Sequence, residues 1–279
     1  MRNSVASLFI LALLLLFPLT AVDFLEDDKR SNAVSTGVYD VPTWRIGDEW
    51  IYETQFDVLK LLQQANVAAS IVTLTGDTSV TVTNILFMTL NGTQTLVYEV
   101  TITGVFTTGA NGAELEGQLG SVDVDYDGID IFRVNDLSLV SSEFNLFVEF
   151  FPNSGFVCWF TNCELADINF FTSYEPVKEK RDFPIRTGDQ WHQTFYSQTI
   201  VTGTSDYFDP NEFQTQGPEN NSWQITNSGV PTEDGTTIQY SGCADSLKIM
   251  EWNETGINAG FEWFCPEARN YAWSRVDNS

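Results

Sequence analysis

Residues 44–50 read WRIGDEW and residues 183–191 read FPIRTGDQW, so the motif R-x-G-D-x-W occurs twice in the chain. In each copy the Gly and Asp predict a tight turn, because Gly accepts a positive φ and an Asp side chain can bond to nearby backbone N–H groups. The Trp that ends each motif predicts the start of a strand anchored in the core. When Gly47 is aligned with Gly188, the chain reads as two copies of one β unit.

The two motifs set the expected domain boundaries. A first β unit is predicted at residues 39–177 and a second, shorter unit at residues 182–279, with a linker between them at residues 178–181. The linker lies in the stretch EPVKEKRD, which holds three of the 13 basic residues and has no apolar pattern. Near its end each unit carries Gly-Phe, Trp-Phe and a Cys close together, which favours an internal repeat.

Between the motifs, short stretches rich in Val, Ile, Thr and aromatic residues alternate with polar residues, as strands do. Asn91-Gly92 and Asp127-Gly128 each predict a two-residue hairpin turn. One helix is predicted at residues 57–66, because apolar residues recur there at helical spacing and Asp57 can act as its N-cap. The expected fold class is therefore all-β with one short helix, built as two related antiparallel units of the curved-sheet or half-barrel type.

A family resemblance rests on the residues that open and close the units. These are Gly47 with Trp50, Gly188 with Trp191, and Cys265-Pro266-Glu267 with Tyr271 and Trp273. The pattern resembles that of uncharacterised secreted archaeal and bacterial β-proteins, some of which look like the LolA/LppX half-barrel. It covers only the ends of each unit, and the first unit has Cys163-Glu164-Leu165 in place of the Cys-Pro-Glu. The resemblance implies a curved antiparallel sheet around an apolar cavity, and carriage of an apolar ligand.

The N-terminus has the layout of a secretory signal peptide. Arg2 precedes an apolar run from Val5 to Phe17, and small residues follow up to Ala21, after which cleavage is expected. The alternative is an uncleaved anchor, although the run is shorter than the roughly 20 residues that span a bilayer. Residues 1–21 are thus predicted to be a signal peptide and residues 22–38 an acidic flexible spacer, and the protein is expected outside the cell or on its surface.

The chain is strongly acidic, with 38 Asp and Glu against 13 Lys and Arg and a formal net charge of −25. Nucleic acids and anionic membranes carry charge of the same sign and repel the chain, so nucleic acid is not expected as a partner. Such a composition suits a salty environment, where counter-ions screen the self-repulsion. No segment after the signal peptide is long and apolar enough to predict a membrane span.

Four cysteines in a secreted chain predict two disulfides. Of the three possible pairings the local one is preferred, which joins Cys158 to Cys163 and Cys243 to Cys265. A zinc site is the alternative, but the chain has no C-x-x-C motif and His192 is its only histidine. Three N-x-S/T sequons predict glycosylation at Asn91, Asn220 and Asn253.

A calcium site is the one metal hypothesis that the sequence offers. The run Asp123-Val-Asp125-Tyr-Asp127-Gly resembles the opening of a calcium loop, in which alternate carboxylates converge on the ion. The acid expected to close the loop is missing, because Val134 stands at that position. The alternative is an exposed strand face that ends in a hairpin turn, with no cofactor.

Five aromatic residues near the ends of the units could form a ligand platform, although such residues more often belong to a core. They are Trp159, Phe160, Trp263, Phe264 and Trp273. A Ser-His-Asp or Cys-His device would need His192, which follows a strand Trp and should face away from the core. No phosphate loop, nucleophile elbow or HExxH motif occurs, so no enzymatic activity is expected.

The leading functional hypothesis is a secreted or cell-surface, non-enzymatic protein that binds an apolar or glycan ligand or other envelope proteins. One alternative is a structural component of the cell envelope without a small ligand, and another is a secreted hydrolase that uses a pair of carboxylates. Ligand binding predicts an open patch of aromatic side chains. A structural role predicts that the same side chains are buried.

If residues 1–21 are a cleaved signal peptide, the protein purified from its own host begins at Val22. N-terminal sequencing of that protein tests this directly. A purified chain that still carries residues 5–17 would show that the apolar run is retained as an anchor.

Overall fold

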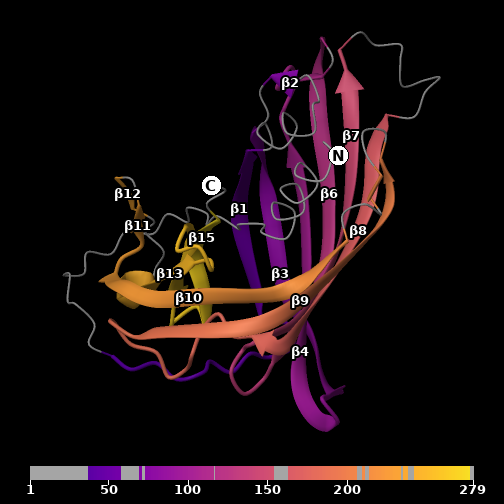
Figure 1. Ribbon diagram of the computed structural model, residues 1–279. Helices are drawn as coiled ribbons and strands as arrows, with labels where there is room; N and C mark the ends of the chain where they lie inside the picture. The colour runs from indigo at the N-terminus through magenta and orange to yellow at the C-terminus, as the bar shows by residue number, and fades with distance from the viewer. Residues whose placement is uncertain are drawn as a thin grey trace.

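The computed structural model describes residues 37–57, 69–70, 73–115, 117–153, 163–205, 209–210, 214–233, 235–237 and 242–276. Most of them form long antiparallel strands (Figure 1). The strands are β1 (Glu49–Asp57), β2 (Ala69–Ser70), β3 (Thr73–Leu90), β4 (Thr93–Thr107), β5 (Ala113–Leu115), β6 (Gln118–Arg133), β7 (Leu139–Pro152), β8 (Glu164–Lys178), β9 (Gln190–Ser205), β10 (Thr215–Gly229), β11 (Thr232–Glu233), β12 (Thr236–Thr237), β13 (Ser246–Trp252), β14 (Asn258–Cys265) and β15 (Asn270–Val276).

Thirteen of these strands form one sheet in the order β1-β3-β4-β6-β7-β8-β9-β10-β13-β14-β15, and the short strands β2 and β5 extend it beside β6. Strands β11 and β12 form a separate hairpin. Figure 1 shows the sheet turning strongly between β8 and β10, so that β13 and β15 come back toward β1. The prediction of an all-β protein with a curved antiparallel sheet is confirmed.

No α-helix occurs among the residues that the structure describes, and η2 (Cys243–Asp245) is a 3-10 turn. Asp57, the expected N-cap of a helix, is instead the last residue of β1. The remainder of the predicted helix, residues 58–66, lies outside the described residues.

The two R-x-G-D-x-W motifs form turns with the same hydrogen bonds. Gly47 has a φ of 87° and Gly188 a φ of 93°. In both turns the backbone N–H of the Arg donates to the Asp side chain. The Gly N–H donates to the carbonyl of one residue on the neighbouring strand, and the N–H of that same residue donates to the Asp carbonyl. The strand residue is Val82 of β3 in the first turn and Ile225 of β10 in the second.

Side chains rather than a strand ladder connect β1 to the last hairpin. Trp44 and Trp50 donate their indole N–H groups to the carbonyls of Arg269 and Ala268, at 2.7 and 2.8 Å. The Tyr52 hydroxyl donates to the Tyr271 carbonyl at 3.0 Å, and the two rings stack at 4.6 Å. The first motif therefore ties the beginning of the sheet to its end.

Alternate residues on the inner face of the sheet form the core. Its main cluster gathers side chains from β1 to β9, among them a stack of Tyr126, Phe144 and Phe170 across β6, β7 and β8. A second cluster lies under β9, β10, β13 and β14 and includes Phe195, Trp223 and Phe264.

The hairpin prediction succeeds at one of its two positions. Asn91 and Gly92 join β3 to β4, and both have a positive φ. The prediction at Asp127-Gly128 is wrong, because both residues lie within the continuous strand β6. A Cβ at Gly128 would lie 3.1 to 3.2 Å from Tyr126, Glu143 and Phe144, so this Gly allows close packing rather than a turn.

The sheet is continuous across the predicted boundary between the two units. Strand β8 pairs with β9 from Ala166↔Ser205 to Glu175↔Tyr196. Lys178 ends β8, and both Lys178 and Arg181 of the expected linker are buried. The segment 178–181 thus packs into the molecule.

Gly203→Ala should destabilise the protein more than Gly47→Ala. Both glycines have a positive φ, which costs an L-residue about 1–2 kcal/mol. A Cβ at Gly203 would also lie 2.0 Å from the Asp167 carbonyl of the paired strand, whereas nothing lies within 4 Å at Gly47. We expect the Gly203 variant to lose at least about twice as much free energy of unfolding, measured by urea denaturation. Equal losses would contradict a tight β8–β9 ladder at this position.

Candidate functional site

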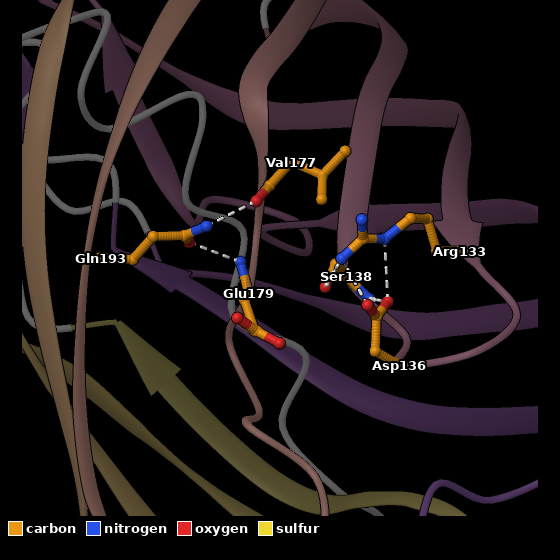
Figure 2. Close-up of polar contacts among 6 residues, drawn as sticks. All are labelled: Arg133, Asp136, Ser138, Val177, Glu179 and Gln193. Atoms are coloured by element: carbon orange, nitrogen blue, oxygen red, sulfur yellow. Dashed lines mark hydrogen bonds and ion pairs between the residues drawn. The ribbon is translucent and has the colours of Figure 1, made fainter. Parts of the chain in front are cut away.

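The most distinctive chemistry in the described residues is a group of charged side chains in the interior, which centres on residues 178–181 and is here called the basic segment. The backbone of this region is held by β9, as Figure 2 shows. Gln193 donates to the Val177 carbonyl and accepts from the Glu179 N–H, both at 2.8 Å. The indole of Trp191 donates to the Glu179 carbonyl at 3.1 Å. These bonds direct the basic segment onto the inner side of the sheet.

Lys178 forms the first ion pair of this group. Its Nζ lies 3.2 Å from Oε1 of Glu251 on β13, and Asn221 of β10 donates its side-chain N–H to the same oxygen at 2.9 Å. Burial disfavours the Glu251 carboxylate, but Lys178, Lys180 and the Asn221 bond outweigh burial and lower the pKa of Glu251. Burial likewise opposes the Lys178 ammonium, and Glu251 more than compensates, so the pKa of Lys178 is raised. Both groups are therefore charged at neutral pH.

Arg181 forms the second ion pair. Its guanidinium binds both carboxylate oxygens of Glu262 on β14, with Nη2 3.1 Å from Oε2. Its Cζ lies 5.3 Å from the centre of the Phe264 ring, so a cation–π contact adds to the pair. The Arg181 residue is only 8% exposed, which makes this a buried bidentate ion pair.

Lys180 and Asp130 are less well compensated. Burial and the neighbouring Lys178 lower the pKa of Lys180. Burial raises the pKa of Asp130, and Ser142 and Lys180 only partly oppose this shift. Burial also raises the pKa of Tyr174, beside Lys178, to about 12, so its hydroxyl stays protonated at neutral pH.

A separate ion pair closes the loop between β6 and β7, also drawn in Figure 2. Arg133 binds Asp136, and Asp136 accepts the Ser138 N–H at 3.0 Å. Burial raises the pKa of the nearby Glu179, and Asp182 and Asp136 add to the shift. This carboxylate therefore sits among like charges at the end of the interior group.

Two of the five residues of the predicted aromatic platform are buried in the structure. Trp263 and Phe264 are each 1% exposed, and the Trp263 indole donates to Glu233 at 2.8 Å. Trp273 is half-buried and packs edge-on against Phe261. Trp159 and Phe160 lie outside the described residues.

The three aspartates of the calcium hypothesis lie on the outer side of β6. Asp123, Asp125 and Asp127 alternate with the buried residues Val124 and Tyr126 along one continuous strand. Alternate residues of a strand are separated by roughly 7 Å, so the three carboxylates run in a row rather than converging on a point. Among the described residues no group of three or more His, Cys, Asp or Glu side chains could hold a metal ion.

The cysteine prediction is confirmed for one pair. Cys243 and Cys265 form a disulfide with an S–S distance of 2.04 Å, which fixes η2 to the end of β14. Cys163 is also disulfide-bonded, and Cys158, its expected partner, lies outside the described residues.

The sequon asparagines occupy different kinds of position. Asn91 lies in the β3–β4 turn and Asn220 on the exposed side of β10, whereas the Asn253 side chain accepts bonds from Thr255 and Ile257. His192 is exposed on β9, as the sequence predicted. Glycosylation at the three asparagines stays a prediction.

Sequence reasoning missed Lys178, Arg181, Asn221, Glu251 and Glu262 as a group. The available signal was the concentration of three basic residues at 178–181 in a chain with only 13. Charge runs are normally solvated, and nothing in the local pattern indicates the distant acids that pair with them.

Comparison with known proteins identifies no relative. No protein-family model, no curated protein and no solved structure matches this chain.

Arg181→Met should cost about 3–5 kcal/mol in the free energy of unfolding, because it leaves the Glu262 carboxylate buried without its cation. The double variant Arg181→Met/Glu262→Gln should recover part of this loss, since no unpaired charge remains. Urea denaturation of the two variants and wild type measures both effects.

Arg186→Met is the matched control, because Arg186 pairs with Asp189 at the surface and its side chain is 66% exposed. Its expected cost is about 0–1 kcal/mol. A similar cost at both arginines would contradict a buried pair at Arg181.

Proposed function

We propose that this protein is a secreted or cell-surface component with a non-enzymatic, structural role in the cell envelope. The observation that carries the proposal is the enclosure of two of the aromatic residues on which ligand binding would depend. Trp263 and Phe264 are buried, and Lys178 and Arg181 in the nearby interior are paired with carboxylates of the same chain. Such an interior stabilises a scaffold.

The state of the two interior carboxylates that pair with cations, Glu251 and Glu262, supports a non-enzymatic role. A glycosidase of the usual kind needs one carboxylic acid that keeps its proton near neutral pH, opposite a second carboxylate. Glu251 instead has a lowered pKa and is bound to Lys178. Glu262 accepts hydrogen bonds from two guanidinium nitrogens of Arg181, Nε and Nη2. These acids act as counter-ions for buried cations.

The outer face of the sheet supports a location in contact with a salty medium. Outward-facing positions of β1, β3, β6, β7 and β8 carry acids, as the strand registers show, and the basic residues of these five strands are Arg133 and Lys178, at the strand ends. The acids are Glu49, Glu53, Asp77, Asp123, Asp125, Asp127, Glu143, Glu149, Glu164 and Asp167. Like charges at this density repel one another and are stabilised by counter-ions.

Secretion is supported by the disulfide. The Cys243–Cys265 disulfide is typical of proteins that fold in an oxidising compartment. Among the described residues no helix is long and apolar enough to cross a membrane.

The structural role predicts that the protein associates with itself or with other envelope proteins, and that salt strengthens this association by screening the acidic face. Sedimentation of the protein purified from its own host, over a range of protein and salt concentrations, should show oligomers that increase with both. Mass spectrometry before and after extraction with organic solvent is the companion measurement. A monomer at all concentrations that carries an extractable lipid or glycan would overturn the structural role in favour of a carrier.

A further inference from the structure

Three side chains with complementary chemistry meet at the inner face of β10. Lys178 comes from the end of β8, Asn221 from β10 and Glu251 from β13. The Lys178 Nζ and the Asn221 side-chain nitrogen both contact Oε1 of Glu251, at 3.2 and 2.9 Å. Because both nitrogens contact the same Glu251 oxygen, the distance between the Lys178 Nζ and the Asn221 side-chain nitrogen cannot exceed the sum of these two distances.

Lys178 and Asn221 are largely closed to water, and two aromatic rings lie beside the lysine. Lys178 is 5% exposed and Asn221 is 8% exposed. The Lys178 Nζ lies 5.5 Å from the centre of the Phe195 ring and 6.0 Å from that of Tyr174. The ion pair is the resting state of Lys178 and Glu251, and their 3.2 Å contact gives the ammonium proton a direct path to the carboxylate.

We propose that Lys178 and Asn221 become joined by an amide bond between the lysine Nζ and the asparagine Cγ, and that Glu251 is the acid–base group for this reaction. The proposal goes beyond the structural role and stands on the geometry of these three residues alone.

The reaction needs no oxidant, reductant or cofactor. Glu251 first takes a proton from the Lys178 ammonium through their contact, which leaves a neutral amine. The amine attacks Asn221 Cγ, and Glu251 transfers the proton to the asparagine nitrogen that already donates to it. The Cγ–Nδ2 bond breaks, and Glu251 takes the second proton of the lysine nitrogen and passes it to the departing ammonia. The leaving group departs as ammonium, and Glu251 is again a carboxylate.

The proposed bond would join two strands that are not neighbours in the sheet. Strand β9 lies between β8 and β10, so the bond would connect the end of β8 to β10 across β9. It would also secure the basic segment, which is held in the interior by contacts with β9 and with the two carboxylates. Covalent closure of this loop removes conformational freedom from the unfolded chain, as a disulfide does.

The test is mass spectrometry of the full purified chain and of its tryptic peptides after reduction and alkylation. We expect the intact mass to be lower than the sequence requires by one ammonia, about 17 Da. Trypsin cannot cleave after an acylated lysine, so the digest should contain a branched species of residues 134–180 and 187–248. Fragmentation of that species should place the bond at Lys178 and Asn221.

Variants separate the chemistry from the fold. Lys178→Arg, Asn221→Ala and Glu251→Gln should each retain the full mass and give separate peptides, whereas Lys180→Arg, at a neighbouring lysine, should still form the bond. Circular dichroism checks that each variant is folded, and the wild-type mass decides the question even if the variants do not fold.

Two outcomes would overturn the proposal. One is a folded wild-type chain with its full mass and separate tryptic peptides after prolonged incubation. The other is a mass loss that fragmentation assigns elsewhere, such as a loss of water, about 18 Da, between Lys178 and Glu251, or a cyclised Asn221 that is not joined to lysine.

Discussion

The structure depends on the hydrogen bonds by which the first strand holds the last hairpin. The indoles of Trp44 and Trp50 and the hydroxyl of Tyr52 all donate to backbone carbonyls in residues 268–271. Asp48 reinforces this contact through an ion pair with Arg269 at 2.9 Å. An open sheet of this length leaves its two edge strands exposed, and these side-chain bonds keep the two edges close without a closing ladder.

Because the sheet curls in this way, its inner face encloses the basic segment. Burying Lys178 and Arg181 costs free energy that their ion pairs offset only with good geometry, so the pairs contribute less to net stability than to fixing one arrangement. Each cation reaches a carboxylate on a different late strand, Glu251 on β13 and Glu262 on β14. The middle of the chain is thereby positioned against its C-terminal strands.

Local patterns were sufficient where the partner of a residue is close in the sequence or fixed by backbone geometry. The Asn91-Gly92 turn and the Cys243–Cys265 disulfide were predicted on that basis and are confirmed. Asp127-Gly128 has the same local signal as Asn91-Gly92, yet it lies inside a strand, because the close approach of Tyr126 and Phe144 decides that a glycine is needed there. That approach depends on β7, which the local pattern does not specify.

The sequence by itself determined that the chain forms antiparallel β structure, because alternation places apolar residues on one face of each strand, and that the two R-x-G-D-x-W motifs form the same turn. Only the tertiary structure decided that the basic segment is buried, that Lys178, Asn221 and Glu251 meet, and that Trp50 faces the last hairpin. The physical reason is that a charge or a polar side chain is stable in the interior only beside its partner. Here the partners lie far along the chain, and the curvature of one continuous sheet brings them together.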